Sequence, residues 1–567
     1  MEQLSSLNWT KLSSDPYLRW GEAQANATLL VLAAVAFGVC YLLRGPVIYP
    51  GFPAVGVDNK AWGWFKYRKA IREYRIRGKQ IIGEGSKFQK PFQVVTDTVT
   101  KICFPPDYAD ELKNIKSLSF TKALTKELFT TYRGFEPIKA TSHESNILQS
   151  ITRLKITPSL NYLTDDIAAE ASIALKEQLG APNEWHEATF KPIVQNLVAR
   201  LSARLFVGTE LCRNQEWLKV STAYATNVFV AAYALRSWPH LLRWPVSWFL
   251  PECRRLRQTV ADARQTLKPV IADHSKRDRH NQSEKTHQQP KADTIDWLLD
   301  AFEKAGIMGT WNVADAQLGL SIVAIHTTTE ALTSALFDIV ATGSQFINEL
   351  RQEMIRVLGP ETVSQSHING GRTVFNKMNL YEMKLLDSTL KESQRLHTRG
   401  FGKPTLDPIC LALLLTFCAN LIILPEKGAM GRVAEADVRL SDGSVIPKGA
   451  FSIVTLESYK SKELYPQPET FNPRRFLEMR LQRGQEKSWQ FVTTSPHHLG
   501  FGYGDHACPG RFLAANEIKV ALVYLLMEYD WKLPGQRPQD TMVIGSQHQA
   551  DPKARVLFRK RVSEIAL

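Results

Sequence analysis

One short segment near the C-terminus constrains the fold more than any other feature of this sequence. Residues 501–511 read Phe-Gly-Tyr-Gly-Asp-His-Ala-Cys-Pro-Gly-Arg, and an apolar run over residues 512–526 follows. Gly504 and Gly510 permit a tight loop, because glycine adopts backbone conformations that are closed to other residues. The backbone N–H groups of such a loop and the N-terminus of the following helix both stabilise a cysteine thiolate. We therefore expect Cys508 to be a metal-binding thiolate at the start of a buried helix.

Other residues of this loop suit the same interpretation. His506 supplies a hydrogen-bond donor or a positive charge, and Phe501 can shield the sulfur from water. Two alternatives are a glycine-rich turn with a structural cysteine and a zinc site made of His497, His498, His506 and Cys508. The spacing of those four residues does not suit a tetrahedral zinc cage.

The loop resembles the haem-binding loop of cytochromes P450, whose pattern FxxGx[RH]xCxG is met at every fixed position. The resemblance implies that Cys508 is the axial ligand of the iron of haem b and that His506 contacts a haem propionate. It also implies a mainly α-helical fold with small β-sheets, the P450 fold. The resemblance extends from about Tyr49 to Arg561.

Two further motifs occur in the order found in that family. Glu392-Ser393-Gln394-Arg395 matches the ExxR motif of the family's K helix, and residues 471–476 match its PxRF segment. Two residues at positions i and i+3 lie on one helical face and can form an ion pair. By resemblance, Glu392, Arg395 and Arg475 form a buried network that stabilises the core beside the haem.

A third motif lies within residues 315–345, which are mostly apolar and predict a helix long enough to cross the core. Val323-Ala324-Ile325-His326-Thr327-Thr328 is similar to the family's distal I-helix motif, [AG]Gx[DE]T[TS]. By resemblance, Thr327 hydrogen-bonds dioxygen and guides protons to it. The sequence departs from the pattern where Ala324 stands for glycine and His326 for an acid. His326 either relays protons, as imidazole can near neutral pH, or points away and contacts a neighbour in the core.

The remaining periodicity predicts a helix-rich body over residues 61–567. Apolar and basic spacing predicts helices over residues 61–80, 162–178, 190–207, 296–304 and 381–396, and alternation predicts paired strands over residues 91–104. Residues 273–293 are polar and predict an exposed loop between helices. Ser441-Asp442-Gly443 predicts a hairpin turn between short strands.

The N-terminus carries an uncharged apolar run over residues 27–43, followed by a Pro/Gly-rich linker over residues 44–60. The run is at the short end of what a bilayer-spanning helix needs, about 17–25 residues. The alternatives are a buried core helix and a cleaved signal peptide. Acidic residues before the run, and the lack of a clear small-residue cleavage site, disfavour a signal peptide. We expect an uncleaved transmembrane helix at the N-terminus of the P450 fold.

Basic residues fix the expected orientation of this anchor. They concentrate just after the run, at Lys60, Lys66, Arg68, Lys69 and Arg72, which places the body on the cytosolic side. Residues 1–26 then form a lumenal tail with glycosylation sequons at Asn8 and Asn26. Asn26 is the poorer acceptor, because it lies against the membrane. We expect a single-pass protein of the endoplasmic reticulum membrane.

Charge and cysteine content exclude several classes of protein. The chain has 567 residues and a net charge of +14, a balance that suits nucleic acid, an anionic membrane or an acidic protein partner. It contains no RNP, zinc-finger or basic-zipper pattern, so we expect no nucleic-acid partner. Its seven cysteines are scattered without a CxxC pair, which does not suit a disulfide framework.

The family resemblance also implies partners and a reaction. The chain has no flavin or nicotinamide fingerprint, so we expect electrons from NADPH to arrive through a separate NADPH-cytochrome P450 reductase. The alanine-rich anchor and the Ile-His-Thr-Thr sequence resemble fungal P450s of secondary metabolism, many of which act on terpenoid or meroterpenoid skeletons. The implied function is a monooxygenase acting on a hydrophobic small molecule. Alternatives are a haem-thiolate isomerase or dehydratase that needs no reductase, which Thr327 disfavours, and a non-catalytic haem protein.

The chain is longer than the family pattern between Arg395 and Cys508, and the surplus falls on residues 403–429. Residues 409–424 within it are apolar almost throughout. One interpretation is a lipid-facing or dimerising insert, which would obstruct the pocket. We favour a translated intron, because Gly402-Lys403 is compatible with the donor-like string GGTAAG. Ala419-Asn420 is compatible with the branch-point-like string GCTAAC, and the codon of Lys427 can end in AG.

Overall fold

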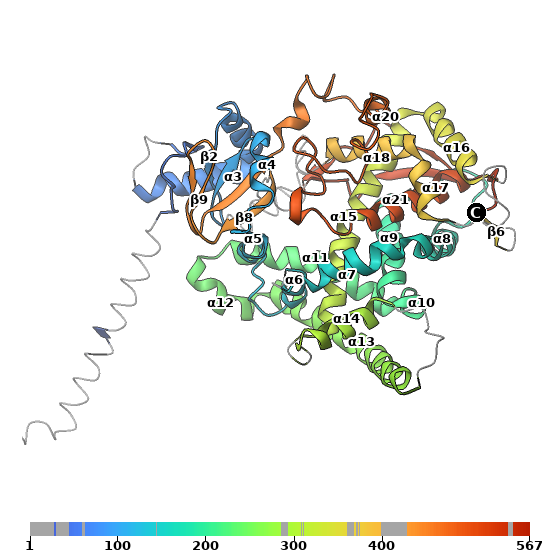
Figure 1. The fold of residues 1–567 in the computed structure, drawn as a ribbon, viewed down its shortest axis with the longest axis horizontal. Coiled ribbons are helices and arrows are strands. Elements are labelled where there is room, and N and C mark those ends of the chain that lie inside the picture. The colour runs from blue at the N-terminus through green and yellow to red at the C-terminus, as the bar shows by residue number, and fades with distance from the viewer. Residues whose placement is uncertain are drawn as a thin grey trace, which may run out of the picture.

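A mainly helical body with small β-sheets is seen in the computed structural model (Figure 1). The structure describes residues 26, 28–29, 45–58, 63–142, 145–284, 293–307, 309, 311–359, 368–369, 372–373, 375–397, 428–542 and 548–567. The predicted fold class, mainly α with small sheets, is confirmed. Of the predicted transmembrane helix over residues 27–43, the structure describes only Thr28 and Leu29, which are helical and exposed. The sequon at Asn8 lies outside the described residues, whereas Asn26 is helical and exposed.

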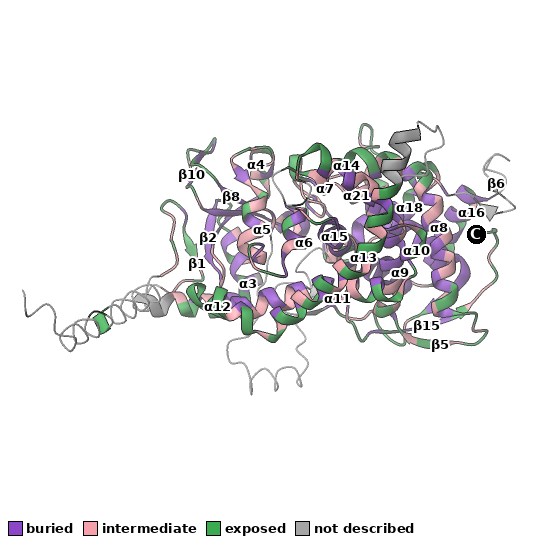
Figure 2. Ribbon diagram, turned by 90° about the horizontal axis from the view of Figure 1, so that it is seen from below, coloured by how far each residue is buried: buried purple, intermediate pink, exposed green. Residues whose placement is uncertain are grey.

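One helix, α15 (Val313–Thr342), runs through the centre of the helical part (Figure 1). Most of its residues are buried around the whole circumference (Figure 2), as expected of a helix without a polar face. It packs against α9 (Phe190–Phe206), α11 (Gln215–Arg236), α18 (Lys384–His397) and α21 (Arg511–Glu528). Among the described residues it is also the one helix long and apolar enough to cross a membrane, but its most apolar stretch is 67% buried, which marks a core helix.

Further helices surround this centre. They are α3 (Gly63–Ser86), α4 (Ala109–Leu112), α5 (Phe120–Leu128), α6 (Glu136–Thr141), α7 (Ile147–Ile151), α8 (Thr157–Leu179), α10 (Gly208–Leu211), α12 (His240–Phe249), α13 (Pro251–Glu284), α14 (Thr294–Lys304), α16 (Ser344–Leu358), α17 (Lys377–Glu382) and α20 (Arg475–Arg480). A π-helical turn, Thr152–Ile156, joins α7 to α8, and short 3₁₀ turns lie at Pro106–Tyr108, Glu457–Lys460 and Gly504–His506.

The largest sheet has six strands and lies with α3 and α5 at one end of the molecule (Figure 1). Its order is β1 (Ala54–Val55), β2 (Phe92–Val95), β3 (Thr100–Phe104), β11 (Phe451–Thr455), β8 (Gly428–Ala434) and β4 (Leu118–Ser119). Strand β11 is parallel to β3 and antiparallel to β8. The sheet covers an apolar core of its own, which includes Phe52, Ile102, Phe104 and Tyr459.

The smaller sheets hold peripheral segments together. A three-stranded sheet pairs β12 (Tyr529–Lys532), β15 (Arg555–Lys560) and β5 (His186–Thr189). Two-stranded pairs are β6 (Ile368–Asn369) with β7 (Arg372–Thr373), β9 (Val438–Arg439) with β10 (Val445–Ile446), and β13 (Thr541–Met542) with β14 (His548–Gln549). The turn predicted at Ser441-Asp442-Gly443 is confirmed between β9 and β10, where Gly443 has a φ of +83°.

Most predicted elements are confirmed, but one is wrong. The helices expected over residues 162–178, 190–207 and 381–396 appear as α8, α9 and α18. The long apolar helix ends at Thr342, because Gly343 has a φ of +111° before α16 begins. Residues 273–293 were expected to form a loop, yet α13 continues through Glu284. No glycine or proline lies between Pro269 and Pro290, so the polarity of this stretch reflects exposure rather than a break in the helix.

The surplus segment is described only at its end. Residues 403–427 lie outside the described residues. Gly428 and Ala429 begin β8, where they pair with Thr455 and Val454 of β11. The six-stranded sheet therefore resumes at Gly428.

Candidate functional site

The loop around Cys508 is closed by backbone hydrogen bonds. The N–H of Cys508 donates to the carbonyl of Phe501 at 2.8 Å, and the N–H of Ala507 donates to that of Gly504 at 2.9 Å. Gly504 has a φ of +72°, and a Cβ there would lie 2.5 Å from Cβ of Lys113. Glycine is therefore required at position 504 for two reasons: the positive φ, and the close approach of the Lys113 side chain.

The Cys508 sulfur lies at the N-terminus of α21. Burial raises the pKa of the thiol, whereas the backbone N–H groups of Gly510 and Arg511 bond to the sulfur and lower it. A Cβ at Gly510 would lie 4.0 Å from Sγ. Cys508 is a free cysteine, and a thiolate with such donors is suited to bind a metal ion.

The zinc alternative finds no support in this geometry. His498 is buried, and its Nε2 lies 2.9 Å from Oε1 of Gln394 rather than near a sulfur. Within the described residues, the three side chains that could together hold a metal ion are His274, Asp293 and Asp296, and Cys508 is not among them. Asp293 and Asp296 there form the capping box of α14, which accounts for their proximity.

Positive side chains surround the loop on one side. Arg432 of β8 is only 4% exposed, and its guanidinium lies 5.5 Å from the ring centre of Phe120. The Phe120 ring lies 6.1 Å from that of His506, and Arg153 donates to the carbonyl of Asp505 at 2.6 Å. Burial lowers the pKa of His506, and the charges of Arg432 and Arg153 lower it further.

Arg432 has no acidic partner among the residues that the structure describes. Its guanidinium donates to the carbonyl of Gly431 at 2.7 Å, and burial lowers its pKa to about 10. A buried cation without a counter-charge is costly, so this position suits an anionic group of a cofactor. Sequence reasoning missed Arg432 and Arg153, although a lone arginine in the apolar strand Gly428–Ala434 was a usable signal.

An accessible face interrupts the otherwise buried helix α15. Val323 is 51% exposed and Thr327 is exposed, although both lie in the middle of this core helix. The two residues are four positions apart and share one face. The hydroxyl of Thr327 donates to the carbonyl of Val323 at 2.7 Å, which leaves its oxygen able to accept a further hydrogen bond.

His326 faces a neighbouring helix. Its half-buried ring lies 5.3 Å from the ring of Phe229 in α11, with the ring planes 42° apart. This is the kind of contact expected if His326 points to a neighbour in the core. Its role in proton transfer stays a prediction.

The structure brings Glu392, Arg395 and Arg475 together. Nε of Arg395 lies 2.8 Å from Oε2 of Glu392, and Nε of Arg475 lies 3.0 Å from Oε1. All three side chains are at most 5% exposed. The remaining donors are satisfied by carbonyls, for example that of Tyr459, to which Arg395 donates at 2.8 Å. The network connects α18 to the start of α20.

Phe501 and Gly502 complete the loop. The Phe501 ring lies 5.2 Å from that of Phe491 in an edge-to-face contact, which helps to exclude water beside the loop. Gly502 has a φ of +70°, a requirement that sequence reasoning did not identify.

Comparisons with known proteins agree with this site. The chain matches the family described as Cytochrome P450 over residues 136–400 and 427–555. It is 36% identical to cytochrome P450 monooxygenase adrA of Penicillium rubens, over 90% of this chain and 92% of that protein. It is 35% identical to cytochrome P450 monooxygenase hepE of Aspergillus oryzae, over 95% of this chain and 91% of that protein. The protein therefore belongs to the cytochrome P450 family.

More specifically, the protein is a cytochrome P450 monooxygenase similar to those of fungal secondary metabolism. Cytochrome P450 monooxygenase pyr3 of Aspergillus fumigatus is 33% identical over 95% of each chain. A solved structure, the retinoic acid bound cyanobacterial CYP120A1, has the same fold. It aligns with a TM-score of 0.58 at 18% identity over 91% of this chain and 100% of that one.

Removal of the shared carboxylate of the buried network tests its structural role. Glu392→Ala leaves Arg395 and Arg475 buried without their common partner, and breaking a buried ion pair costs about 3–5 kcal/mol. We expect a free energy of unfolding lower by about this amount in detergent-solubilised protein, measured by chemical denaturation. Glu303→Ala, which removes an exposed glutamate of α14, is the control and should leave the midpoint of chemical denaturation unchanged. A Glu392→Ala midpoint equal to that of the wild type would contradict the assignment.

Proposed function

We propose that this protein inserts one oxygen atom of O2 into a hydrophobic small molecule, with Cys508 as the axial ligand of haem b. The observation that carries the proposal is the position of the Cys508 sulfur at the start of α21. There the sulfur accepts hydrogen bonds from the backbone N–H groups of Gly510 and Arg511. When bound, haem with a thiolate ligand supplies activation of O2.

The chain's own residues fit haem at this position. Arg432 supplies a buried cation without an acidic partner, Arg153 adds positive charge beside the same loop, and His506 offers a hydrogen-bond donor there. These three residues suit the two haem propionates. Phe501 and Phe491 exclude water near the sulfur, which favours a buried, low-dielectric site.

We assign the positioning of protons on the distal side to Thr327. Its hydroxyl is held by the carbonyl of Val323 on the accessible face of α15, so its oxygen has a fixed direction. His326 or water is the proton source in this proposal. The contact between His326 and Phe229 favours water, because the imidazole is held against α11.

Partners and location follow from the family and the sequence. We propose that an NADPH-cytochrome P450 reductase supplies the electrons and that residues 27–43 anchor the chain in the endoplasmic reticulum membrane. Terpenoid or meroterpenoid skeletons are the proposed substrates, because the relatives are fungal P450 monooxygenases. A reductase-independent isomerase has no use for the oxygen-handling residue Thr327.

Thr327→Ala tests the oxygenase assignment. In protein reconstituted with reductase and a panel of terpenoids, we expect at least about a tenfold loss of product per NADPH and more hydrogen peroxide, because positioned proton transfer contributes about 10²–10⁴-fold. Thr342→Ala is the matched control, since Thr342 makes the same intrahelical bond, to the carbonyl of Asp338 at 2.8 Å. Thr342→Ala should leave the yield unchanged. An unchanged product-to-NADPH ratio in Thr327→Ala would overturn the role of Thr327.

His326 variants separate its two interpretations. His326→Phe preserves a ring against Phe229 but removes the proton-carrying group. Product yield near that of the wild type in His326→Phe, with a loss in His326→Ala, supports a packing role. Equal losses in both variants support a proton relay.

We further propose that residues 403–429 include a translated intron that the working enzyme lacks. The family match stops at residue 400 and resumes at residue 427. Gly428, which follows residue 427 directly, is the first residue of β8.

The transcript decides between these interpretations of the segment. We expect the mature message to lack the codons from about Lys403 to Lys427, measured by sequencing of reverse-transcribed RNA. A mature message that retains them would contradict the proposal and favour a lipid-facing or dimerising insert.

A further inference from the structure

Both ends of the β13–β14 strand pair are held to α15 by charged side chains. Asp540 directly precedes β13, and Ala550 directly follows β14. Asp540 joins an ion cluster around Asp338 of α15, whereas Ala550 hydrogen-bonds to Glu330 of the same helix. The base of the strand pair is therefore fixed at two points along one helix.

The Ala550 end is held by a carboxylate and a lysine. The N–H of Ala550 donates to Oε2 of Glu330 at 3.0 Å, and Nζ of Lys191 in α9 donates to the carbonyl of Ala550 at 3.1 Å. Lys191 and Glu330 also pair with each other, and their side chains are only 11% and 20% exposed. One ion pair thus binds both backbone groups of Ala550 away from most water. We call Glu330 and Lys191 the Ala550 clamp.

The Asp540 end is held by four charged side chains, which we call the Asp540 clamp. Nδ1 of His397, at the end of α18, lies 2.8 Å from Oδ2 of Asp540, and its Nε2 lies 3.0 Å from Oδ2 of Asp338. Arg537 pairs with Asp338 at 2.5 Å and with Asp540 at 3.2 Å. Burial lowers the pKa of His397, but the two carboxylates raise it to about 9 on balance. At neutral pH, two cations therefore face two anions.

Both clamps use the face of α15 that carries Thr327. Glu330 and Asp338 follow Thr327 by three and eleven positions in the sequence, and this spacing keeps all three residues on one side of a helix. Glu330 is the nearer of the two, about 4.5 Å along the helix axis from Thr327. Val323 and Thr327 are exposed on this face. The base of the strand pair therefore lies beside the accessible part of α15.

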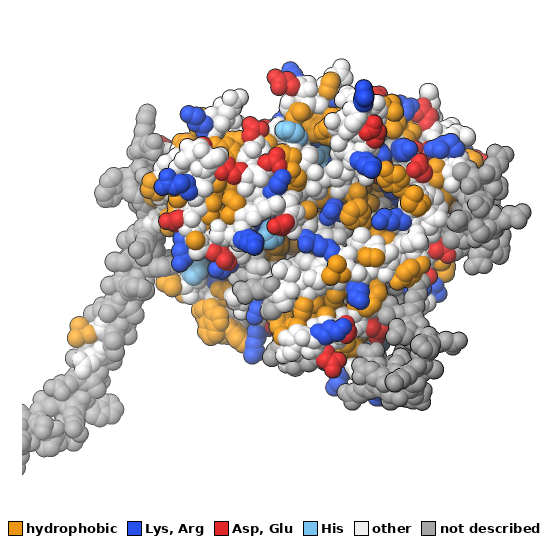
Figure 3. Space-filling view, viewed as in Figure 1, with side chains coloured by type: hydrophobic (Ala, Val, Ile, Leu, Met, Phe, Trp, Pro, Cys, Tyr) orange, Lys and Arg blue, Asp and Glu red, His pale blue; other side chains and the backbone are white. Residues whose placement is uncertain are grey.

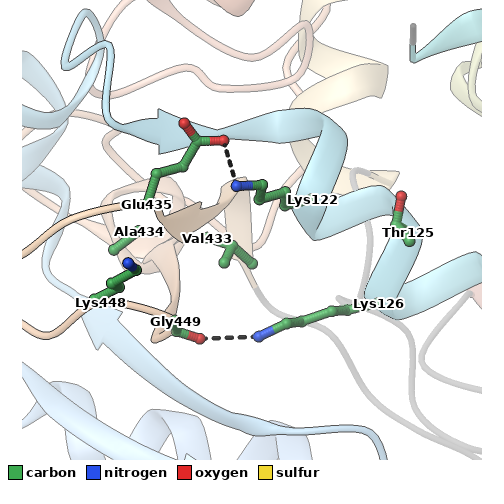
Figure 4. Close-up of a pocket in the computed structure, with 8 residues that line it drawn as sticks. All are labelled: Lys122, Thr125, Lys126, Val433, Ala434, Glu435, Lys448 and Gly449. Atoms are coloured by element: carbon green, nitrogen blue, oxygen red, sulfur yellow. Dashed lines mark hydrogen bonds and ion pairs between the residues drawn. The ribbon is translucent and has the colours of Figure 1, made fainter. Parts of the chain in front are cut away.

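Ion pairs on the surface of the molecule differ from these clamps. Acidic and basic side chains are intermixed over the face seen in Figure 3. Figure 4 shows one such pair, Lys122 with Glu435 at 3.0 Å, in the wall of a pocket beside α5. These side chains are 55% and 41% exposed, so water competes with the pair and it contributes little. A buried pair also adds little net stability, because desolvation offsets the attraction, but it fixes the geometry of the groups that it binds.

We propose that the two clamps set the position of the β13–β14 strand pair as a wall of the substrate site, so that Glu330 and Lys191 determine which carbon of a substrate is oxidised. Both are positioning residues, because they act through the strand pair rather than on the reacting atoms. A shift of this wall changes how a hydrophobic substrate lies against α15 and so changes its reacting carbon. The inference rests on the proposed function, since it takes the face of Thr327 as the place where oxygen is handled.

Hydrogen exchange at the Ala550 amide tests the clamp directly, since this N–H is the group that Glu330 binds. The full-length holoprotein is exchanged in detergent without substrate and analysed by mass spectrometry with fragmentation. We expect Glu330→Ala to speed exchange at Ala550 at least about tenfold, because the amide loses its buried partner and opens locally. Lys191→Met removes the donor to the Ala550 carbonyl and should change the rate in the same direction, so the test stays decisive if Glu330→Ala does not fold. Unchanged exchange would overturn the proposal.

Glu435→Gln is the matched control for charge removal. It takes the acidic partner from the exposed pair with Lys122 in Figure 4 and should leave exchange at Ala550 unchanged. The carbon monoxide difference spectrum of Lys191→Met should match that of the wild type. A loss of the haem–carbon monoxide band in this variant would contradict a role confined to the strand pair.

Product ratios test the consequence for the substrate. In the enzyme reconstituted with reductase and terpenoids, we expect Glu330→Ala to change the ratio of oxidation products from one substrate at least about threefold, because small shifts of a pocket wall alter discrimination. His397→Gln, which weakens the Asp540 clamp, should shift the same ratio. A lower total yield with an unchanged ratio would show a merely structural role and overturn the positioning of substrate.

Failure of this inference and failure of the proposed function give different results. A wild-type enzyme that oxidises no terpenoid contradicts the proposed function, and exchange at Ala550 still decides whether the clamp exists. A wild-type enzyme that is uncoupled by Thr327→Ala, but whose product ratio is unaffected by Glu330→Ala, keeps the proposed function and contradicts only the inference.

Discussion

The contact between the Cys508 sulfur and the N–H groups of Gly510 and Arg511 is the interaction on which the rest of the site depends. It places the sulfur at the N-terminus of α21, where the helix dipole also favours negative charge. The contact requires a loop that only glycine can form, since Gly504 combines a positive φ with a close approach to Lys113. The loop is therefore fixed from two directions, by α21 and by the segment after α4.

Two groups of buried arginines near this loop have different functions, and the difference lies in their partners. Arg395 and Arg475 share the carboxylate of Glu392, so their charges are neutralised within the protein and their role is structural. Arg432 is equally buried but has no acidic partner among the described residues. A charge that the protein leaves uncompensated in its interior indicates a ligand of opposite charge. We propose that the haem propionates supply it.

The sequence was sufficient for features that depend on local pattern. The Cys508 loop, α8, α9, α15 and the turn at Gly443 were predicted from spacing and residue type, whereas the ExxR and PxRF motifs were identified by resemblance to the family. It failed where neighbours far apart in the chain decide the outcome. The contact of His326 with Phe229 and the burial of Arg432 depend on packing between distant elements. The continuation of α13 to Glu284 was missed because polarity was interpreted as a loop, although charged residues are good helix formers.

The most direct test of the central claim is the carbon monoxide difference spectrum of the reduced holoprotein. Thiolate ligation by Cys508 predicts the red-shifted Soret band that is characteristic of the family. Cys508→Ser should lose this band, whereas Cys212→Ser, at a buried free cysteine elsewhere, should keep it. A wild-type protein that binds haem but gives a Soret band without the red shift would contradict the account.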